Sequence, residues 1–157
     1  MYNNQISATI LGELGNLKSL NDLILDRNKL IGTISNSLGK LSYLKFLYLC
    51  DNQLSSPIPQ EIGNLMNLSE LLLDTNHFIG FLPQNLCQSG SLQNLSAYNN
   101  HLTGPIPKTL RNCTSLIRVR LKRNQLSRNI FEDFGVYKNL QFIDLSYNRF
   151  YGEISQN

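Results

Sequence analysis

Asparagine recurs at a constant interval of 24 residues along this chain of 157 residues. A fixed period of roughly 20 to 50 residues indicates a solenoid, in which each repeat forms one coil that stacks on its neighbours. We therefore expect an elongated array whose long inner surface holds another molecule, rather than an enzyme with a catalytic pocket. The series comprises Asn4, Asn28, Asn52, Asn76, Asn100, Asn124 and Asn148.

Apolar residues occupy fixed positions around each asparagine. Around Asn52, for example, they are Leu44, Leu47 and Leu49 before it, and Leu54 and Ile58 after it. This is the pattern L-x-x-L-x-L-x-x-N-x-L of leucine-rich repeats, followed by a second apolar half. The L-x-L piece has the period of two that is typical of a strand. We predict an α/β fold, a right-handed leucine-rich-repeat solenoid (horseshoe) with a parallel β-sheet on its concave face. Its convex side should carry mostly 3-10 turns and short outer strands, and the concave strands should centre near residues 23–25, 47–49, 71–73, 95–97, 119–121 and 143–145.

The asparagines follow these predicted strands directly. An asparagine side chain offers two amide donors and one carbonyl acceptor, so it can satisfy backbone groups that a bend leaves unpaired. We interpret the column as a structural ladder without a catalytic role. Its members within complete repeats are Asn28, Asn52, Asn76, Asn100, Asn124 and Asn148.

The second half of the repeat shows where the backbone bends. Glycine stands four residues after the asparagine in Gly32, Gly80, Gly104 and Gly152. Because Ala8, Ser56 and Arg128 occupy the same position, we do not expect a positive φ to be required there. Proline lacks a backbone N–H and should end the outer extended piece, as in Pro59, Pro83 and Pro107.

The form L-x-G-x-I-P, best seen in LTGPIP at 102–107, resembles the plant type of leucine-rich repeat. The whole chain resembles the extracellular part of plant leucine-rich-repeat receptor-like kinases. The stretch RNCTSLIRVRLKRNQL…FEDFGVYKNLQFIDLSYNRFYGEIS at 111–155 is similar to the subfamily that senses SCOOP-type secreted peptides. This resemblance implies a location at the extracellular face of the plasma membrane and a secreted peptide or protein ligand on the concave face. It also implies a co-receptor kinase ectodomain as a partner, and no cofactor.

Two other functions remain open. Plant polygalacturonase inhibitors share the repeat of 24 residues and bind a folded enzyme. The chain is alternatively a truncated, non-signalling decoy. The class of ligand, a short peptide or a folded enzyme, separates the receptor from the inhibitor.

Length and composition restrict these functions further. Residues 1–157 should form a single array of about six and a half repeats, with both ends lacking the polar caps that solenoids need. The net charge of +3 is too small to indicate nucleic-acid binding. We expect no signal peptide, and the chain has no apolar run near the ~20 residues that cross a membrane, so we also expect no membrane insertion by the chain itself. It also lacks the nucleotide loop and catalytic motifs of a kinase, so we expect no enzyme activity.

The cysteines and the glycosylation sequons indicate whether the chain belongs to a secreted, oxidising compartment. Cys87 and Cys113 are one repeat plus two residues apart, so neighbouring coils bring them near enough for a disulfide. The resemblance to plant receptor ectodomains also implies this pair, and two reduced thiols are the alternative. Cys50 should be a free thiol, not a nucleophile, because no histidine is placed to activate it. The glycosylation sequons begin at Asn67, Asn94 and Asn112.

The residues six, four, two and one before each ladder asparagine, and the one after it, should face outward on the concave sheet. Carboxylates dominate the first three coils of this surface and four cations crowd the fifth, with aromatic residues between them. An extended peptide with separated charges would find complementary partners there. The candidate ligand-binding residues are Tyr48, Glu70, Asp74, His77, Asn94, Tyr98, His101, Arg118, Arg120, Lys122 and Phe142.

Within this set, Arg118 and Arg120 alternate along one strand and should project from the same face. The pair resembles the R-x-R of plant receptors that receive the free carboxyl end of a peptide. No aromatic residue interleaves with this cationic cluster in the sequence, which argues against a nucleic-acid site. His77 and His101 share one column of the repeat, but two histidines without further ligands do not make a metal site.

Overall fold

Six parallel strands, one from each coil, form a continuous sheet in the computed structural model, which describes residues 1–129 and 137–152. Leu23, Leu47 and Leu71 are partners in its register, so neighbouring strands are shifted by one whole repeat. Each strand begins and ends one residue before the predicted span. The residue just past the strand still bonds to the next coil, as Leu25 N donates to Tyr48 O at 2.9 Å. The strands are β1 (Asp22–Ile24), β3 (Phe46–Tyr48), β5 (Glu70–Leu72), β7 (Asn94–Ser96), β9 (Arg118–Arg120) and β11 (Phe142–Asp144).

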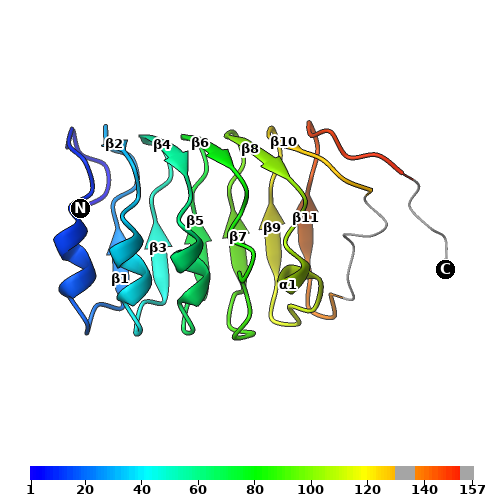
Figure 1. Cartoon of the computed structure of the whole chain (residues 1–157), viewed down its shortest axis with the longest axis horizontal. Coiled ribbons are helices and arrows are strands. Elements are labelled where there is room, and N and C mark those ends of the chain that lie inside the picture. Colours follow the sequence, from blue (N-terminus) through cyan, green and yellow to red (C-terminus); the bar gives the residue numbers. More distant parts are fainter. Residues whose placement is uncertain (130–136, 153–157) are drawn as a thin grey trace.

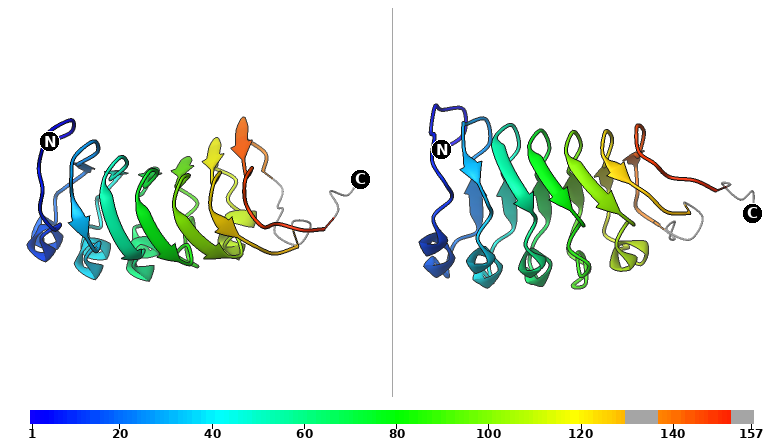
Figure 2. Two further views of the ribbon diagram at one scale, coloured as in Figure 1. Left: turned by 90° about the horizontal axis from the view of Figure 1, so that it is seen from above. Right: turned by 45° about the horizontal axis from the view of Figure 1, so that its top comes forward.

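A second parallel sheet of five strands covers the convex side, and the stack curves with the six-stranded sheet on its inner face (Figures 1 and 2). Its strands are β2 (Ile31–Gly32), β4 (Gln53–Pro57), β6 (His77–Gly80), β8 (His101–Gly104) and β10 (Gln125–Leu126). Short helical turns return the chain to the next concave strand: η1 (Gly12–Asn16), η2 (Asn36–Lys40), η3 (Gln60–Asn64) and α1 (Lys108–Arg111). The parallel sheets and 3-10 turns confirm the predicted leucine-rich-repeat solenoid.

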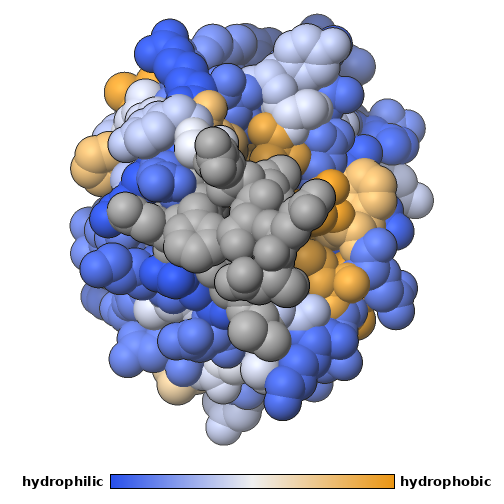
Figure 3. Space-filling model, turned by 90° about the vertical axis from the view of Figure 1, so that its right-hand side faces the viewer, coloured by the Kyte–Doolittle hydropathy of each residue, from blue (hydrophilic) through white to orange (hydrophobic). Residues whose placement is uncertain are grey.

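Leucine columns from successive coils meet between the two sheets in one core. Leu47, Leu71 and Leu95 are fully buried, and each stacks on the equivalent residue of the next coil. Burial of this apolar area is the main driving force for stacking, at about 25 cal/mol per Å². In the last described coil the same column holds Ile143, which is 36% exposed. In an end view, hydrophilic residues form most of the visible rim of this face, and hydrophobic residues appear mainly on its right-hand side (Figure 3). Ile130 and Ile154 of the second apolar half lie outside the described residues.

The asparagine column forms the hydrogen-bonded ladder that the sequence predicts. The side-chain amide of Asn52 donates to Leu25 O and Leu49 O, at 3.1 Å each, and to Cys50 O at 3.2 Å. Its carbonyl oxygen accepts from Leu30 N at 3.0 Å. Each side chain therefore joins its own turn to the preceding coil. Asn76, Asn100 and Asn124 repeat this pattern in the interior, and Asn28 and Asn148 repeat it toward the two ends.

The expectation that this position does not require a positive φ holds at Ala8 and Arg128 but is wrong at Ser56. Ser56 has a φ of 75°, close to the 72° of Gly80 and the 76° of Gly104 in later coils. Ala8 and Arg128 do not adopt a positive φ. Gly32 and Gly152, nearer the two ends, share this conformation with φ values of 80° and 98°, so the bend takes it in most coils, and Ser56 accepts a conformation that side chains disfavour.

The structure joins Cys87 and Cys113 in a disulfide with a Cα–Cα distance of 5.9 Å. Among the described residues Cys50 is the free cysteine, and it is half-buried. In the part of the chain that the structure describes, no helix has the length and hydrophobicity to cross a membrane.

Candidate functional site

An open groove of about 380 Å³ lies on the concave face, across the middle coils. Its lining includes acidic residues from the second and third coils and arginines from the fifth. The charges that the sequence separates along the chain therefore border one continuous space. The residues that line it are Arg27, Cys50, Asp51, Glu70, Leu72, Asp74, Asn94, Leu95, Ser96, Tyr98, Arg118 and Arg120.

Arg118 and Arg120 project from the same face of β9, on either side of the buried Val119. The guanidinium carbon of Arg118 lies 5.1 Å from the ring centroid of Phe142, and that of Arg120 lies 5.0 Å from the ring of Tyr98. Stacking uses the flat face of a guanidinium group and leaves its N–H donors in the plane of the group. The two arginines are thus oriented by aromatic neighbours while their edges can still bind a carboxylate.

These contacts overturn the premise that no aromatic residue interleaves with the cations. The ring centroid of Tyr147 also lies 5.4 Å from Lys122 Nζ and 5.6 Å from the guanidinium carbon of Arg123. The aromatic partners stand about one repeat away in sequence, and the parallel stacking brings them alongside the cations. Absence of aromatic residues therefore cannot argue against nucleic acid. The carboxylates of Glu70 and Asp74 in the same groove are the better argument, because they repel a phosphate chain.

The acidic side of the groove has a fixed hydrogen bond. The hydroxyl group of Tyr48 donates to Glu70 Oε2 at 2.6 Å. Burial, and then this bond to the neighbouring carboxylate, raise the pKa of Tyr48 well above its usual value. The phenol therefore stays protonated and holds the Glu70 carboxylate toward the groove.

Two residues of the concave surface are buried, although the repeat pattern predicts that they face outward. Asp74 is 8% exposed and Ser96 is 4% exposed. Burial raises the pKa of Asp74, while the nearby Ser96 hydroxyl and its own backbone N–H lower it. Asp74 and Ser96 belong to adjacent coils and lie near each other, a relationship that a pattern within one repeat does not reveal.

A second, smaller pocket of about 200 Å³ adjoins the cations and is lined by Tyr98, Arg120, Lys122, Arg123 and Asp144. Lys122 Nζ lies 3.9 Å from Asp144 Oδ2. The hydroxyl and backbone N–H of Ser146 donate to the Asp144 carboxylate and, with Lys122 and Arg120, lower its pKa. Asp144 therefore stays ionised and partly neutralises this end of the groove.

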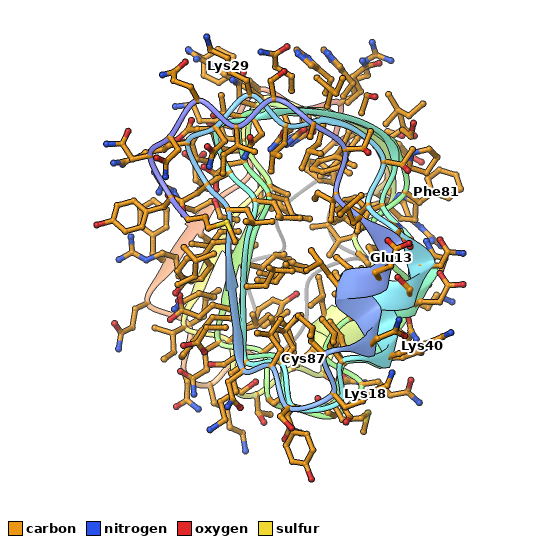
Figure 4. The ribbon with its side chains drawn as sticks, turned by 90° about the vertical axis from the view of Figure 1, so that its left-hand side faces the viewer. Glu13, Lys18, Lys29, Lys40, Phe81 and Cys87 are labelled. Carbon is orange, nitrogen blue, oxygen red and sulfur yellow. A yellow bond between two sulfur atoms is a disulfide. The ribbon has the colours of Figure 1, made fainter. Side chains whose placement is uncertain are left out.

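His77 and His101 do not lie on the concave sheet as predicted. They begin β6 and β8 of the second sheet, and their rings stack at a centroid distance of 6.1 Å. Figure 4 looks along the stack and shows Lys29, which has the same position in its repeat, at the bend between the two sheets. The chain has already turned away from the concave face at this position. Among the described residues no group of three potential ligands could hold a metal ion.

Cys50 and the three sequon asparagines have distinct surroundings. Burial and then the charges of Asp74, Asp26 and Asp51 raise the pKa of the Cys50 thiol to about 12, so the thiol stays protonated at neutral pH.

Of the three sequon asparagines, Asn94 lines the groove. Asn67 and Asn112 are exposed. A glycan on Asn94 would therefore occupy the groove.

Residues 43–65, 91–113 and 139–157 match the family model of the Leucine Rich Repeat. The comparison with curated proteins gives no match. Among solved structures, the ectodomain of the Arabidopsis thaliana receptor kinase SOBIR1 is 32% identical with a TM-score of 0.74, over 83% of this chain and 72% of that chain. The chain belongs to the leucine-rich-repeat family of plant receptor ectodomains.

Two longer members of this family are solved with peptides. The plant peptide hormone receptor RGFR1 in complex with RGF2 is 36% identical with a TM-score of 0.90, over 94% of this chain and 24% of that chain. The Arabidopsis receptor kinase HAESA in complex with the peptide hormone IDA and the co-receptor SERK1 is 31% identical with a TM-score of 0.77, over 92% of this chain and 26% of that chain. This leucine-rich-repeat chain thus spans about a quarter of those two proteins. The resemblance to the subfamily that senses SCOOP-type peptides stays a prediction.

Proposed function

We propose that this chain is the ligand-binding segment of a plant leucine-rich-repeat receptor-like kinase or receptor-like protein, and that it binds a secreted peptide on its concave face for cell-surface signalling. The observation that carries the proposal is the groove, with Glu70 and Asp74 toward one side and Arg118 and Arg120 on the other. An extended peptide with separated charges complements this arrangement. The peptide complexes of RGFR1 and HAESA support the same ligand class.

The arginine pair is the proposed anchor for the free carboxyl end of the peptide. Arg118 and Arg120 present exposed guanidinium groups from alternate positions of one strand, and both stack on aromatic rings. A carboxylate accepts paired N–H donors from such groups. Further contacts on the concave face would fix the rest of the peptide, from Tyr48, Asn94, Tyr98, Lys122 and Phe142.

The proposed partner of this chain comes from a comparison with a member of the same family. The HAESA complex contains the co-receptor SERK1. We extend this to a co-receptor kinase ectodomain for this chain, placed at the extracellular face of the plasma membrane. The chain itself would be non-catalytic, with glycans on the exposed Asn67 and Asn112 and none on Asn94 during ligand binding.

Capture from the medium of cultured plant cells tests this proposal. The immobilised chain, and a control carrying Arg118→Ala and Arg120→Ala, are exposed to the medium, and bound molecules are identified by mass spectrometry. The proposal expects short peptides with a free carboxyl end on the unaltered chain and their loss from the control. Selective retention of a folded enzyme would favour the inhibitor function, and no retained peptide would contradict the receptor function.

A further inference from the structure

We propose that Asp74 and Ser96 form a cation-binding subsite in the floor of the groove, which takes the lysine or arginine side chain of the bound peptide. The inference rests on the proposed peptide-binding function and adds the chemistry of one ligand residue. It assigns a role to two buried polar side chains that are not part of the asparagine ladder, the disulfide or the arginine anchor.

Asp74 is a buried carboxylate without a cationic partner. It lies two residues after the end of β5, lines the groove, and is 8% exposed. Among the described residues, no lysine or arginine forms an ion pair with its carboxylate. A buried charge without a partner is costly, so a ligand that supplies the opposite charge there should gain favourable free energy.

Ser96 points to the same subsite. Its side chain is 4% exposed, and its hydroxyl group has no hydrogen-bond partner of ordinary geometry. The hydroxyl lies near enough to the Asp74 carboxyl group to lower its pKa, and both residues line the groove. A buried hydroxyl without a partner destabilises the folded chain, so a ligand group that bonds to it is favoured. The groove thus holds a carboxylate and a hydroxyl group side by side, both able to accept from one ligand ammonium or guanidinium group.

The surrounding charges favour a cation at this place. Asp51 and Glu70 also line the groove. Two arginines that line the groove have partners within the chain. Arg27 Nε lies 3.8 Å from Asp51 Oδ2, and the guanidinium group of Arg120 stacks on the ring of Tyr98. Arg27 is thus paired with Asp51. Arg120, although its charge also acts on Asp74, forms no ion pair with it among the described residues, so the Asp74 carboxylate stays open to a ligand cation.

The distance along the stack fixes where the cation should stand in the peptide. The carboxylate anchor is on β9 and Asp74 follows β5, two strands away in the sheet. Two strand spacings are about 10 Å, and an extended peptide advances about 3.3 Å per residue. About three residues therefore separate the two groups. With the reach of a long side chain, we expect the cation at the third to fifth residue from the carboxyl end.

A randomised peptide mixture provides the test. Synthetic nonapeptides with a free carboxyl end, and a matched amidated mixture, are captured on the immobilised chain and sequenced by mass spectrometry. We expect enrichment of lysine and arginine at the third to fifth residue from the carboxyl end. Asp74→Asn should reduce this enrichment by about tenfold, because it removes the charge-assisted bond but keeps the shape of the side chain.

Two further variants complete the experiment. Asp26→Asn is the matched control, because Asp26 has the same position in its repeat two coils earlier and does not line the groove, and it should retain the full enrichment. Ser96→Ala should reduce the enrichment less than Asp74→Asn does. It also removes an unpartnered hydroxyl and so should not impair folding.

The outcomes separate this inference from the proposed function. Preference for free over amidated peptides without cation enrichment, or with enrichment that Asp74→Asn leaves unchanged, overturns the subsite and leaves the receptor function in place. Cation enrichment that depends on Asp74, with equal capture of both mixtures, supports the subsite and overturns the carboxylate anchor. Failure to capture any peptide overturns both.

Discussion

The guanidinium carbon of Arg120 lies 5.0 Å from the ring centroid of Tyr98, which belongs to the preceding coil. The contact joins an anchor of the proposed ligand to a ring that also lines the groove. It restricts the arginine before any ligand arrives, so less conformational entropy is lost when a carboxylate binds.

This relationship predicts an energetic coupling between the two side chains. In a double-mutant cycle of Tyr98→Leu and Arg120→Ala, the coupling should be about 0.5–1 kcal/mol in the free energy of unfolding, the usual value for a cation over an exposed ring. Urea denaturation of the four proteins measures it. Additive effects of the two substitutions would show that the stacking has no energetic consequence.

The ladder makes a second prediction. Asn76→Ala removes bonds to Leu49 O at 2.9 Å and from Leu54 N at 2.9 Å, both buried. The free energy of unfolding should fall by about 1–3 kcal/mol, because the backbone partners are left unsatisfied. Asn21→Ala, at an exposed position, is the control and should change it little. Equal denaturation midpoints for the two variants would contradict the structural role.

Much of this architecture follows from the sequence, because the interval of 24 residues fixes which residues stack. The concave strands, the ladder and the face shared by Arg118 and Arg120 all depend only on that register. The burial of Asp74 and Ser96 does not follow from that register, because outward positions of the pattern are exposed at Arg118 and Arg120 but buried at these two. Contacts between repeats decide it, and a pattern read within one repeat does not contain them.

The histidines show a second limit of the sequence. His77 and His101 follow the ladder asparagine directly, and the repeat pattern does not tell at which residue the chain leaves the concave face. The structure places the bend there, because the second sheet begins with these residues. The aromatic partners of the cations were likewise missed because they stand in adjacent coils.

The disulfide makes a third prediction. Cys87 and Cys113 enclose a loop of 26 residues, and closing a loop of this length should stabilise the fold by about 3–4 kcal/mol. The comparison uses a Cys50→Ala background, so that the disulfide is the one group that a reductant changes. Denaturation with and without reductant measures the difference. An unchanged midpoint would mean that the crosslink does not restrict the unfolded chain.

Asp74 should make stability depend on pH. Burial raises the pKa of its carboxyl group in the folded chain above the ordinary value. Its contribution is therefore most favourable below the ordinary pKa and is lost as the pH rises through the folded pKa. Asp74→Asn should accordingly raise the free energy of unfolding, relative to the unaltered chain, more at pH 7 than at pH 3. Urea denaturation at both values checks this, and an equal or opposite difference would argue against a buried, unpaired carboxylate.

The central claim is that the concave groove binds the free carboxyl end of a peptide through Arg118 and Arg120. The most direct measurement is calorimetric titration of the unaltered chain and of the Arg118→Ala, Arg120→Ala double variant with a captured peptide and its amidated form. We predict that amidation weakens binding to the unaltered chain by about 2–5 kcal/mol, that the double substitution has a similar effect, and that amidation adds little on top of it. Equal affinity of the unaltered chain for the free and amidated peptides would contradict the claim.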